Sequence, residues 1–222
     1  MSDPAHGVTL AVEELLAAAL RGESAPWPEG PAGTVETRVV EQARVHGVEA
    51  LLADAMHRGT AGAEWPAGLR TALAASARRE ALAEPLRYLE LKRVLAGLLE
   101  AGLQPLVLKG AHLAYTHYPH PHLRPCSDLD LLIRPDDRQA AKRVIAALGY
   151  RPGRYVTGEL VTHQFHRARE TSSGVRHELD VHWRIADPQR FAHLLSFDEL
   201  AREAVPIPTL GAGARGLSPV SA

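Results

Sequence analysis

The chain has 222 residues, 45% of them hydrophobic, which is enough to bury a sizeable core as one domain or as two small ones. Its 25 Lys and Arg residues balance its 26 Asp and Glu residues, which argues against the basic surface that holds a nucleic-acid template. A single cysteine, Cys126, excludes an intramolecular disulfide, and without a signal peptide or an apolar stretch of roughly 20 residues we expect a cytoplasmic protein with no membrane span.

The first hundred residues predict helices separated by loops rich in Pro and Gly. Apolar positions at helical spacing predict one helix over 10–20 and a second over 35–57, which Gly47 divides into two segments. A third helix is expected over 69–100, and Pro85 should kink or restart it. This part of the chain is therefore expected to be helical.

The pattern changes after Gly102, where short apolar runs alternate with helical segments. The expected elements are a strand over 105–109, a helix over 111–118, a strand over 129–133, a helix over 138–148 and a strand over 175–185. Strands that alternate with helices in this way indicate an α/β unit with a mixed sheet.

The sharpest local motif is Ser-Asp-Leu-Asp-Leu-Leu-Ile, residues 127–133. Because side chains alternate along a strand, Asp128 and Asp130 should share one face while Leu129 and Leu131 face the core. Two adjacent carboxylates repel each other unless a cation lies between them, which suits a Mg²⁺ site open to phosphate oxygens. The same motif also occurs on strands whose polar face is simply solvated.

A second strand carries the same alternation in His-Glu-Leu-Asp-Val-His-Trp, residues 177–183. Glu178, Asp180 and His182 should share one face. If this strand pairs beside the first, Asp180 completes a cluster of three carboxylates, the arrangement that two-metal phosphoryl transfer requires. The alternative is an exposed edge strand with mixed charges.

The segment Leu-Val-Leu-Lys-Gly-Ala, residues 106–111, runs from a strand into a helix. Gly110 should let backbone amides approach a phosphate at the start of that helix, and Lys109 would add a positive charge. Arg124 is either a phosphate clamp or the partner of the carboxylates. An ordinary turn with a surface lysine would give the same sequence.

The sequence has two further candidate sites, a histidine cluster and the single cysteine. Of 12 histidines, His112, His117, His120 and His122 lie close together, but without cysteine pairs their spacing does not favour zinc, and we expect this loop to line a nucleotide or acceptor pocket. Nearby negative charge should make Cys126 unreactive, so we expect it to be a packing residue.

The order of these motifs resembles a known family. The chain carries Lys109-Gly110, Tyr118-Pro119, Arg124-Pro125, Ser127-Asp128-Leu-Asp130 and Glu178-Leu-Asp180-Val-His182-Trp183. Over about residues 35–185 it is similar to the uncharacterised nucleotidyltransferases of the polymerase-β-like superfamily.

The resemblance implies an α+β fold: an N-terminal helical region over 1–101, a nucleotidyltransferase core with a small mixed sheet and flanking helices over 102–205, and a flexible tail over 206–222. It also implies transfer of a nucleoside monophosphate from a nucleoside triphosphate to an acceptor, with release of pyrophosphate. Asp128, Asp130 and Asp180 would be catalytic and would hold two Mg²⁺ ions. The nucleotide would be bound by Lys109, Gly110, Ala111, Arg124 and Ser127.

The chain departs from the family pattern at two places. Ala111 stands where the superfamily turn usually has Ser or Gly, and relatives continue into a helical C-terminal region beyond the position of Ala222. These departures favour an alternative, an inactive nucleotide-binding or partner module of a toxin–antitoxin or biosynthetic system. A phosphotransferase that releases ADP is a third reading. The acceptor would be a small molecule or a protein, with nucleic acid disfavoured, and a second copy or a partner protein would cover exposed apolar surface.

Overall fold

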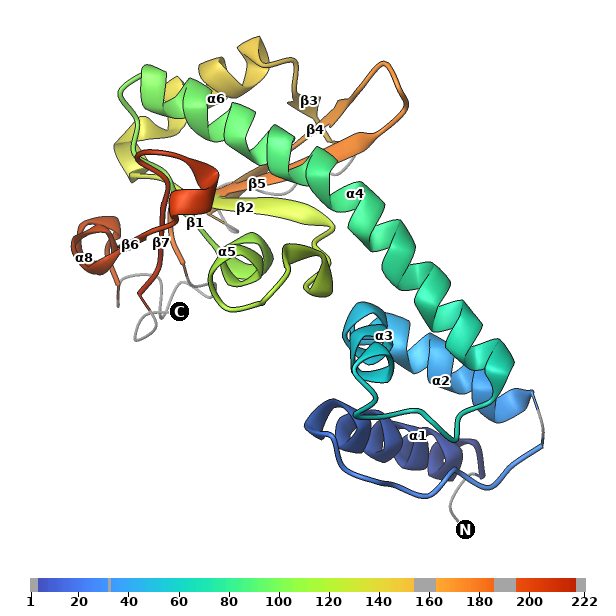
Figure 1. The fold of residues 1–222 in the computed structure, drawn as a ribbon. Coiled ribbons are helices and arrows are strands. Elements are labelled where there is room, and N and C mark those ends of the chain that lie inside the picture. Colours follow the sequence, from blue (N-terminus) through green and yellow to red (C-terminus); the bar gives the residue numbers. More distant parts are fainter. Residues whose placement is uncertain (1–3, 32, 154–162, 186–194, 219–222) are drawn as a thin grey trace. The chain divides into compact units, whose positions relative to one another are not determined.

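The computed structural model describes residues 4–31, 33–153, 163–185 and 195–218 (Figure 1). The chain forms two compact units, one of Met1–Glu84 with Pro119–Pro125 and the other of Pro85–Tyr118 with Cys126–Ala222. The division falls inside a single helix, α4 (Ala67–Glu100), which contains Pro85. Among the described residues, no helix has both the length and the apolar character needed to cross a bilayer.

The first unit is helical, as the sequence predicts. It contains α1 (Pro4–Arg21), α2 (Thr34–Val45), α3 (Glu49–His57), the first half of α4 and the short 3-10 helix η1 (Pro121–Leu123). The break between α2 and α3 lies at Gly47, whose φ of 65° is a conformation that glycine adopts readily. Its core is formed by apolar residues of these helices and of the loop before α4: Val12, Leu15, Leu16, Ala19, Val35, Val39, Ala43, Leu52, Trp65, Leu69 and Leu73.

The second unit contains a mixed sheet, which has seven strands in the described part of the chain, in the order β3-β4-β5-β2-β1-β7-β6. The strands are β1 (Leu106–Val107), β2 (Asp128–Leu132), β3 (Arg151–Pro152), β4 (Gln164–Glu170), β5 (Arg176–His182), β6 (Val205–Pro206) and β7 (Arg215–Gly216). β2 pairs with β5 in parallel, as β1 does with β7, and the other neighbours are antiparallel. Together with the helices, this sheet confirms the predicted α+β class.

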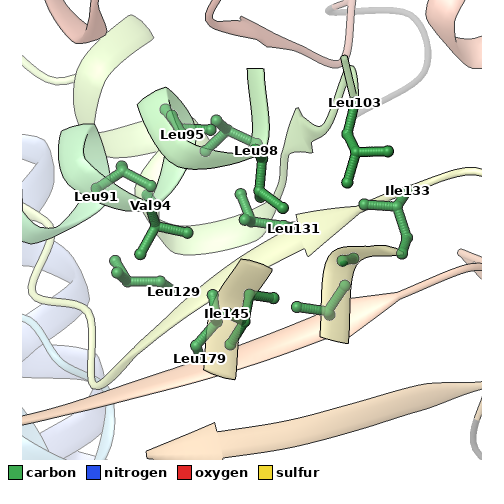
Figure 2. Close-up of a cluster of buried hydrophobic side chains, with 14 of the residues drawn as sticks. Leu91, Val94, Leu95, Leu98, Leu103, Leu129, Leu131, Ile133, Ile145 and Leu179 are labelled. Carbon is green, nitrogen blue, oxygen red and sulfur yellow. The ribbon is translucent and has the colours of Figure 1, made fainter. Parts of the chain in front are cut away.

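One face of the sheet carries the main core of this unit. The second half of α4 and α6 (Arg138–Ala147) pack over it (Figure 2). The strands contribute Leu129, Leu131, Leu179 and Val181, each no more than 5% exposed. These are the positions that strand alternation assigned to the core, so that prediction is confirmed.

The opposite face is apolar at one end and polar beside it. Leu132 packs there with Leu106, Leu108 and the buried residues of α8 (Phe197–Glu203). Because residues two apart on a strand share a face, Asp128 and Asp130 lie on the same side of β2 as Leu132. The polar part of this face begins where the contact with α8 ends.

Several elements differ in extent from the expected ones. α5 (Lys109–Thr116) is separated from the end of the short strand β1 by the single residue Leu108, and β4 occupies a segment after Tyr155 that the sequence left open as a strand or a loop. The C-terminal segment 206–222 supplies strand β7 and the 3-10 helix η3 (Pro208–Leu210), while its residues 219–222 lie outside the described part of the chain. A further 3-10 helix, η2 (Pro135–Asp137), precedes α6.

Candidate functional site

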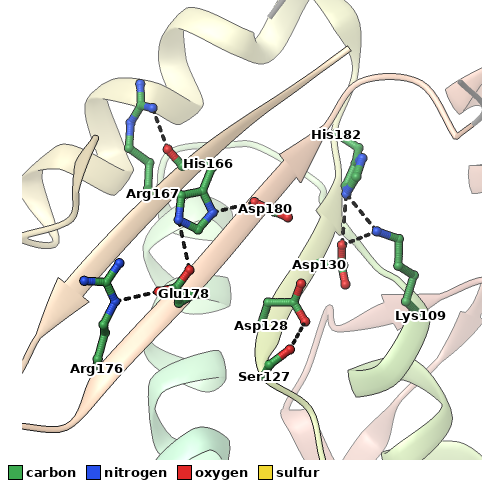
Figure 3. Close-up of polar contacts among 10 residues, drawn as sticks. All are labelled: Lys109, Ser127, Asp128, Asp130, His166, Arg167, Arg176, Glu178, Asp180 and His182. Atoms are coloured by element: carbon green, nitrogen blue, oxygen red, sulfur yellow. Dashed lines mark hydrogen bonds and ion pairs between the residues drawn. The ribbon is translucent and has the colours of Figure 1, made fainter. Parts of the chain in front are cut away.

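The polar face of β2 and β5 brings the predicted carboxylates together. The two strands are neighbours, and Asp130 lies opposite Asp180 in the register, with Asp128 opposite Glu178. The sequence predicts a carboxylate cluster only if these two strands pair, and β2 and β5 do pair (Figure 3). Among the described residues, η2, α6, β3 and β4 lie between β2 and β5 in the chain, so the two strands become neighbours only when the unit folds.

Three side chains at this point are placed to hold a metal ion. Asp130, Asp180 and His182 each offer one ligand atom, and these atoms lie within 4.8 Å of one another. Asp130 is 4% exposed and His182 7% exposed. Two carboxylates and one imidazole form a donor set that suits a divalent cation such as Mg²⁺ or Mn²⁺. The sequence predicts the face of β5 on which His182 lies but assigns it no role.

Two nitrogen groups contact Asp130. Lys109 Nζ donates a hydrogen bond to Asp130 Oδ1 at 2.6 Å, and His182 Nε2 lies 2.9 Å from the same oxygen. Burial opposes the charge on this carboxyl, but the hydrogen bonds from His182 and Lys109 outweigh burial and hold the pKa of Asp130 below its usual value. Asp130 is therefore an ionised carboxylate, ready to bind a cation.

The turn before α5 has an unusual backbone conformation at Lys109. Lys109, not Gly110, has the left-handed backbone, with a φ of 45°. That conformation costs a non-glycine residue on the order of 1 kcal/mol, and here it accompanies the contact between Lys109 and Asp130. Gly110 serves a packing role, because a Cβ at this position would lie 2.8 Å from Cys126 Sγ. Ala111 is buried in the main core.

The close contact at Gly110 gives a testable pair of variants. Gly110→Ala should destabilise the protein by about 1–3 kcal/mol, because the added methyl overlaps Cys126 Sγ. In Gly110→Ala with Cys126→Ala, the nearest remaining atom, the Cys126 Cβ, is at 3.6 Å, so most of the loss should be recovered. Urea unfolding of the two single variants and the double variant measures this coupling. Additive effects would refute the proposed contact.

The other predicted site residues are not members of the donor group formed by Asp130, Asp180 and His182. Asp128 is partly buried and accepts a hydrogen bond from Ser127 Oγ at 3.1 Å, and it is not one of the three grouped ligands. Arg124 belongs to the first unit, where its Nη1 donates to the Pro125 carbonyl at 3.1 Å. The structure thus brings together Lys109, Asp130 and Asp180 from the predicted set.

The histidines of residues 112–122 are divided between the two units. His112 lies on α5 with His117 just after it, whereas His120 and His122 stack on each other in the first unit, with ring centroids 5.6 Å apart. His112 is buried, and burial lowers its pKa, so the ring is neutral at pH 7. The described contacts give these residues no link to the donor group.

His166 contacts Asp180 from the neighbouring strand. It lies on β4 directly opposite Asp180, and its Nδ1 is 2.7 Å from Asp180 Oδ1. Its Nε2 is 3.0 Å from Glu178 Oε2. From the sequence, His166 could lie near the site on a strand or loop after Tyr155, but the sequence assigns it no role. Alternation around Phe165, which is fully buried, was the available signal for the opposite orientation of His166.

Comparison with known proteins agrees with this geometry. A search of curated proteins gave no match. The profile of a family described as uncharacterised nucleotidyltransferase matches residues 34–222, which include every strand of the sheet and the whole donor group. Because the match covers far more than half of the chain, this protein belongs to the uncharacterised nucleotidyltransferase family.

Proposed function

We propose that the protein is a metal-dependent nucleotidyltransferase, which moves a nucleoside monophosphate from a nucleoside triphosphate to an acceptor and releases pyrophosphate. The observation that carries this proposal is the grouping of Asp130, Asp180 and His182 on paired strands beside Lys109. Family membership supports nucleotidyl transfer in general.

Within this proposal the donor group holds the first divalent cation. Asp128, one position along the same face of β2, and Asp180 would complete a site for a second Mg²⁺. Two bound cations would lower the pKa of the acceptor and neutralise the charge of the leaving pyrophosphate. Asp180 is the proposed carboxylate nearest the acceptor, where it would take up the proton.

The triphosphate is proposed to lie against the start of α5. Lys109 has a side chain that is 58% exposed, so its ammonium can turn from Asp130 to phosphate oxygens once a cation neutralises the carboxylate. The backbone amides of Gly110 and Ala111 at the helix N-terminus would add hydrogen-bond donors, and the exposed hydroxyl of Ser127 is a further donor.

The first test is calorimetric titration with each of the four nucleoside triphosphates, with and without Mg²⁺. We expect one or more to bind only when Mg²⁺ is present. Incubation of the best ligand with small-molecule and peptide acceptors should then release pyrophosphate. Failure of all four nucleotides to bind would refute the proposal.

Ala111 favours a second candidate, a module that binds nucleotide without turnover. The turn carries no hydroxyl at this position, and the Ala111 side chain faces the core. Mg²⁺-dependent binding without pyrophosphate release for any acceptor would support this module. Release of ADP in place of pyrophosphate would instead indicate phosphotransfer. The near balance of acidic and basic residues continues to favour a small-molecule or protein acceptor over nucleic acid.

A further inference from the structure

His166 joins two acidic residues of β5 on the polar face of the sheet (Figure 3). Asp180 and Glu178 lie two residues apart on that strand, and His166 is paired opposite Asp180 from β4. The His166 side chain is 15% exposed and that of Asp180 is 17% exposed, so this contact lies largely out of solvent. Beyond it, Glu178 forms an ion pair with Arg176.

The imidazole fixes the orientation of the Asp180 carboxylate. Carboxylate oxygens only accept hydrogen bonds, so the bond between His166 and Asp180 is donated by Nδ1. This bond engages Asp180 Oδ1 and restrains the carboxylate in the orientation in which it offers a ligand atom beside those of Asp130 and His182. Hydrogen bonds of this kind to a ligating carboxylate orient the ligand and tune metal affinity.

The ring itself is held from its other side. Gly153 follows β3, and a Cβ at this position would overlap Cδ2 of His166 and lie 2.8 Å from its Nε2. The backbone at Gly153 therefore packs directly on the imidazole, and only glycine leaves room for the ring. Glu178 and Gly153 together restrict His166 to the orientation in which Nδ1 reaches Asp180.

We propose that His166 is a positioning residue, which holds Asp180 in the orientation that completes the cation site with Asp130 and His182. The inference rests on the proposed function, because it assigns to His166 a role in the same metal site. It predicts that the affinity for the cation itself depends on the hydrogen bond from Nδ1, before any nucleotide is present.

The test is a titration with Mn²⁺ alone, in which the electron paramagnetic resonance signal of the free ion reports how much is bound. His166→Ala should weaken Mn²⁺ binding about 10- to 100-fold. His166→Asn places an amide donor near the position of Nδ1 and should restore most of the affinity. His166→Gln extends its amide toward the position of Nε2 and Glu178, and should bind Mn²⁺ as weakly as the alanine variant.

Two further variants separate positioning from general structure. Gly153→Ala does not alter residue 166, but its added methyl displaces the His166 ring, so it should also weaken Mn²⁺ binding. His177→Asn is the matched control, because His177 is a buried histidine on the same strand as Asp180 that faces the opposite side of the sheet. Its Mn²⁺ affinity should equal that of the wild type.

The outcomes distinguish this inference from the proposed function. If the wild type binds Mn²⁺ and His166→Ala binds it equally well, the positioning role is wrong and the proposed function stands. If His166→Asn is as weak as His166→Ala, the hydrogen bond to Asp180 is not the cause and the inference also fails. If the wild type binds no Mn²⁺, the metal site of the proposed function is overturned, and the role of His166 with it.

Discussion

Asp130→Asn is expected to reduce Mg²⁺-dependent nucleotide binding by at least about 100-fold. Loss of a group that merely orients a metal ligand typically costs about 10- to 100-fold in affinity, so loss of a ligand's own charge should cost more. The substitution keeps the shape of the side chain, and Lys109, the cation left without its partner, has a side chain that is 58% exposed and can be solvated. Circular dichroism should therefore remain that of the wild type.

Two other aspartates, one on β2 and one on η2, serve as comparisons when nucleotide binding is measured by calorimetric titration. Asp136→Asn, at an exposed position of η2, should bind nucleotide as the wild type does. Asp128→Asn should affect nucleotide binding in the presence of Mg²⁺ more than the affinity for a first cation, because Asp128 lies outside the donor group. Unchanged nucleotide affinity in Asp130→Asn would contradict the role of Asp130 as a metal ligand. A variant that fails to fold would show instead that Asp128 and Asp130 are structural.

Glu90→Gln is expected to destabilise the sheet-bearing unit by about 3 kcal/mol, the lower end of the cost of breaking a buried ion pair. Glu90 is 5% exposed and accepts hydrogen bonds from Arg93 at 2.6 Å, Tyr150 Oη at 2.8 Å and Arg169 at 3.0 Å. The variant leaves two guanidinium groups without their carboxylate. Urea unfolding, combined with hydrogen exchange of the β4 and β5 amides, measures the loss in the unit concerned.

The same residue predicts an acid dependence. Burial opposes its charge, but the hydrogen bonds from Arg93 and Tyr150 and the nearby guanidinium charges outweigh burial, so the pKa of Glu90 lies below its usual value. Its contribution is complete above that usual value and is lost as pH falls through the lowered one, below roughly pH 4. Glu90→Gln should lack this part of the acid dependence. The exposed Glu100→Gln on the same helix should change stability by less than about 0.5 kcal/mol.

The sequence predicted those features that depend on alternation within one strand. Leu129 and Leu179 face the core while Asp130 and Asp180 face away from it, because a period of two residues is enough to assign the two sides. The helical first unit followed from apolar spacing in the same way, and Gly47 marked the break between α2 and α3.

Features that depend on distant partners were not predictable. Strand β4 has a polar sequence in which Phe165 is the main apolar residue, so the sequence alone does not decide between a strand and a loop; the pairing with β5 does. Glu90 and Arg169 meet only in the folded unit. At the turn before α5, the sequence does not reveal that Lys109 takes the left-handed φ or that Gly110 lies against Cys126, because both depend on the folded unit.

The parallel pairing of β2 with β5 also affects how the chain reaches its native state. Parallel strands joined by a long connection acquire their register late in folding, after a large loop has closed. A slip of one residue would turn Asp180 into the core and Val181 out of it. A divalent cation that recognises only the native register would stabilise that register by mass action. Under the proposed function, the metal is thus expected to favour the native register of β2 and β5 during refolding, in addition to its role in nucleotidyl transfer.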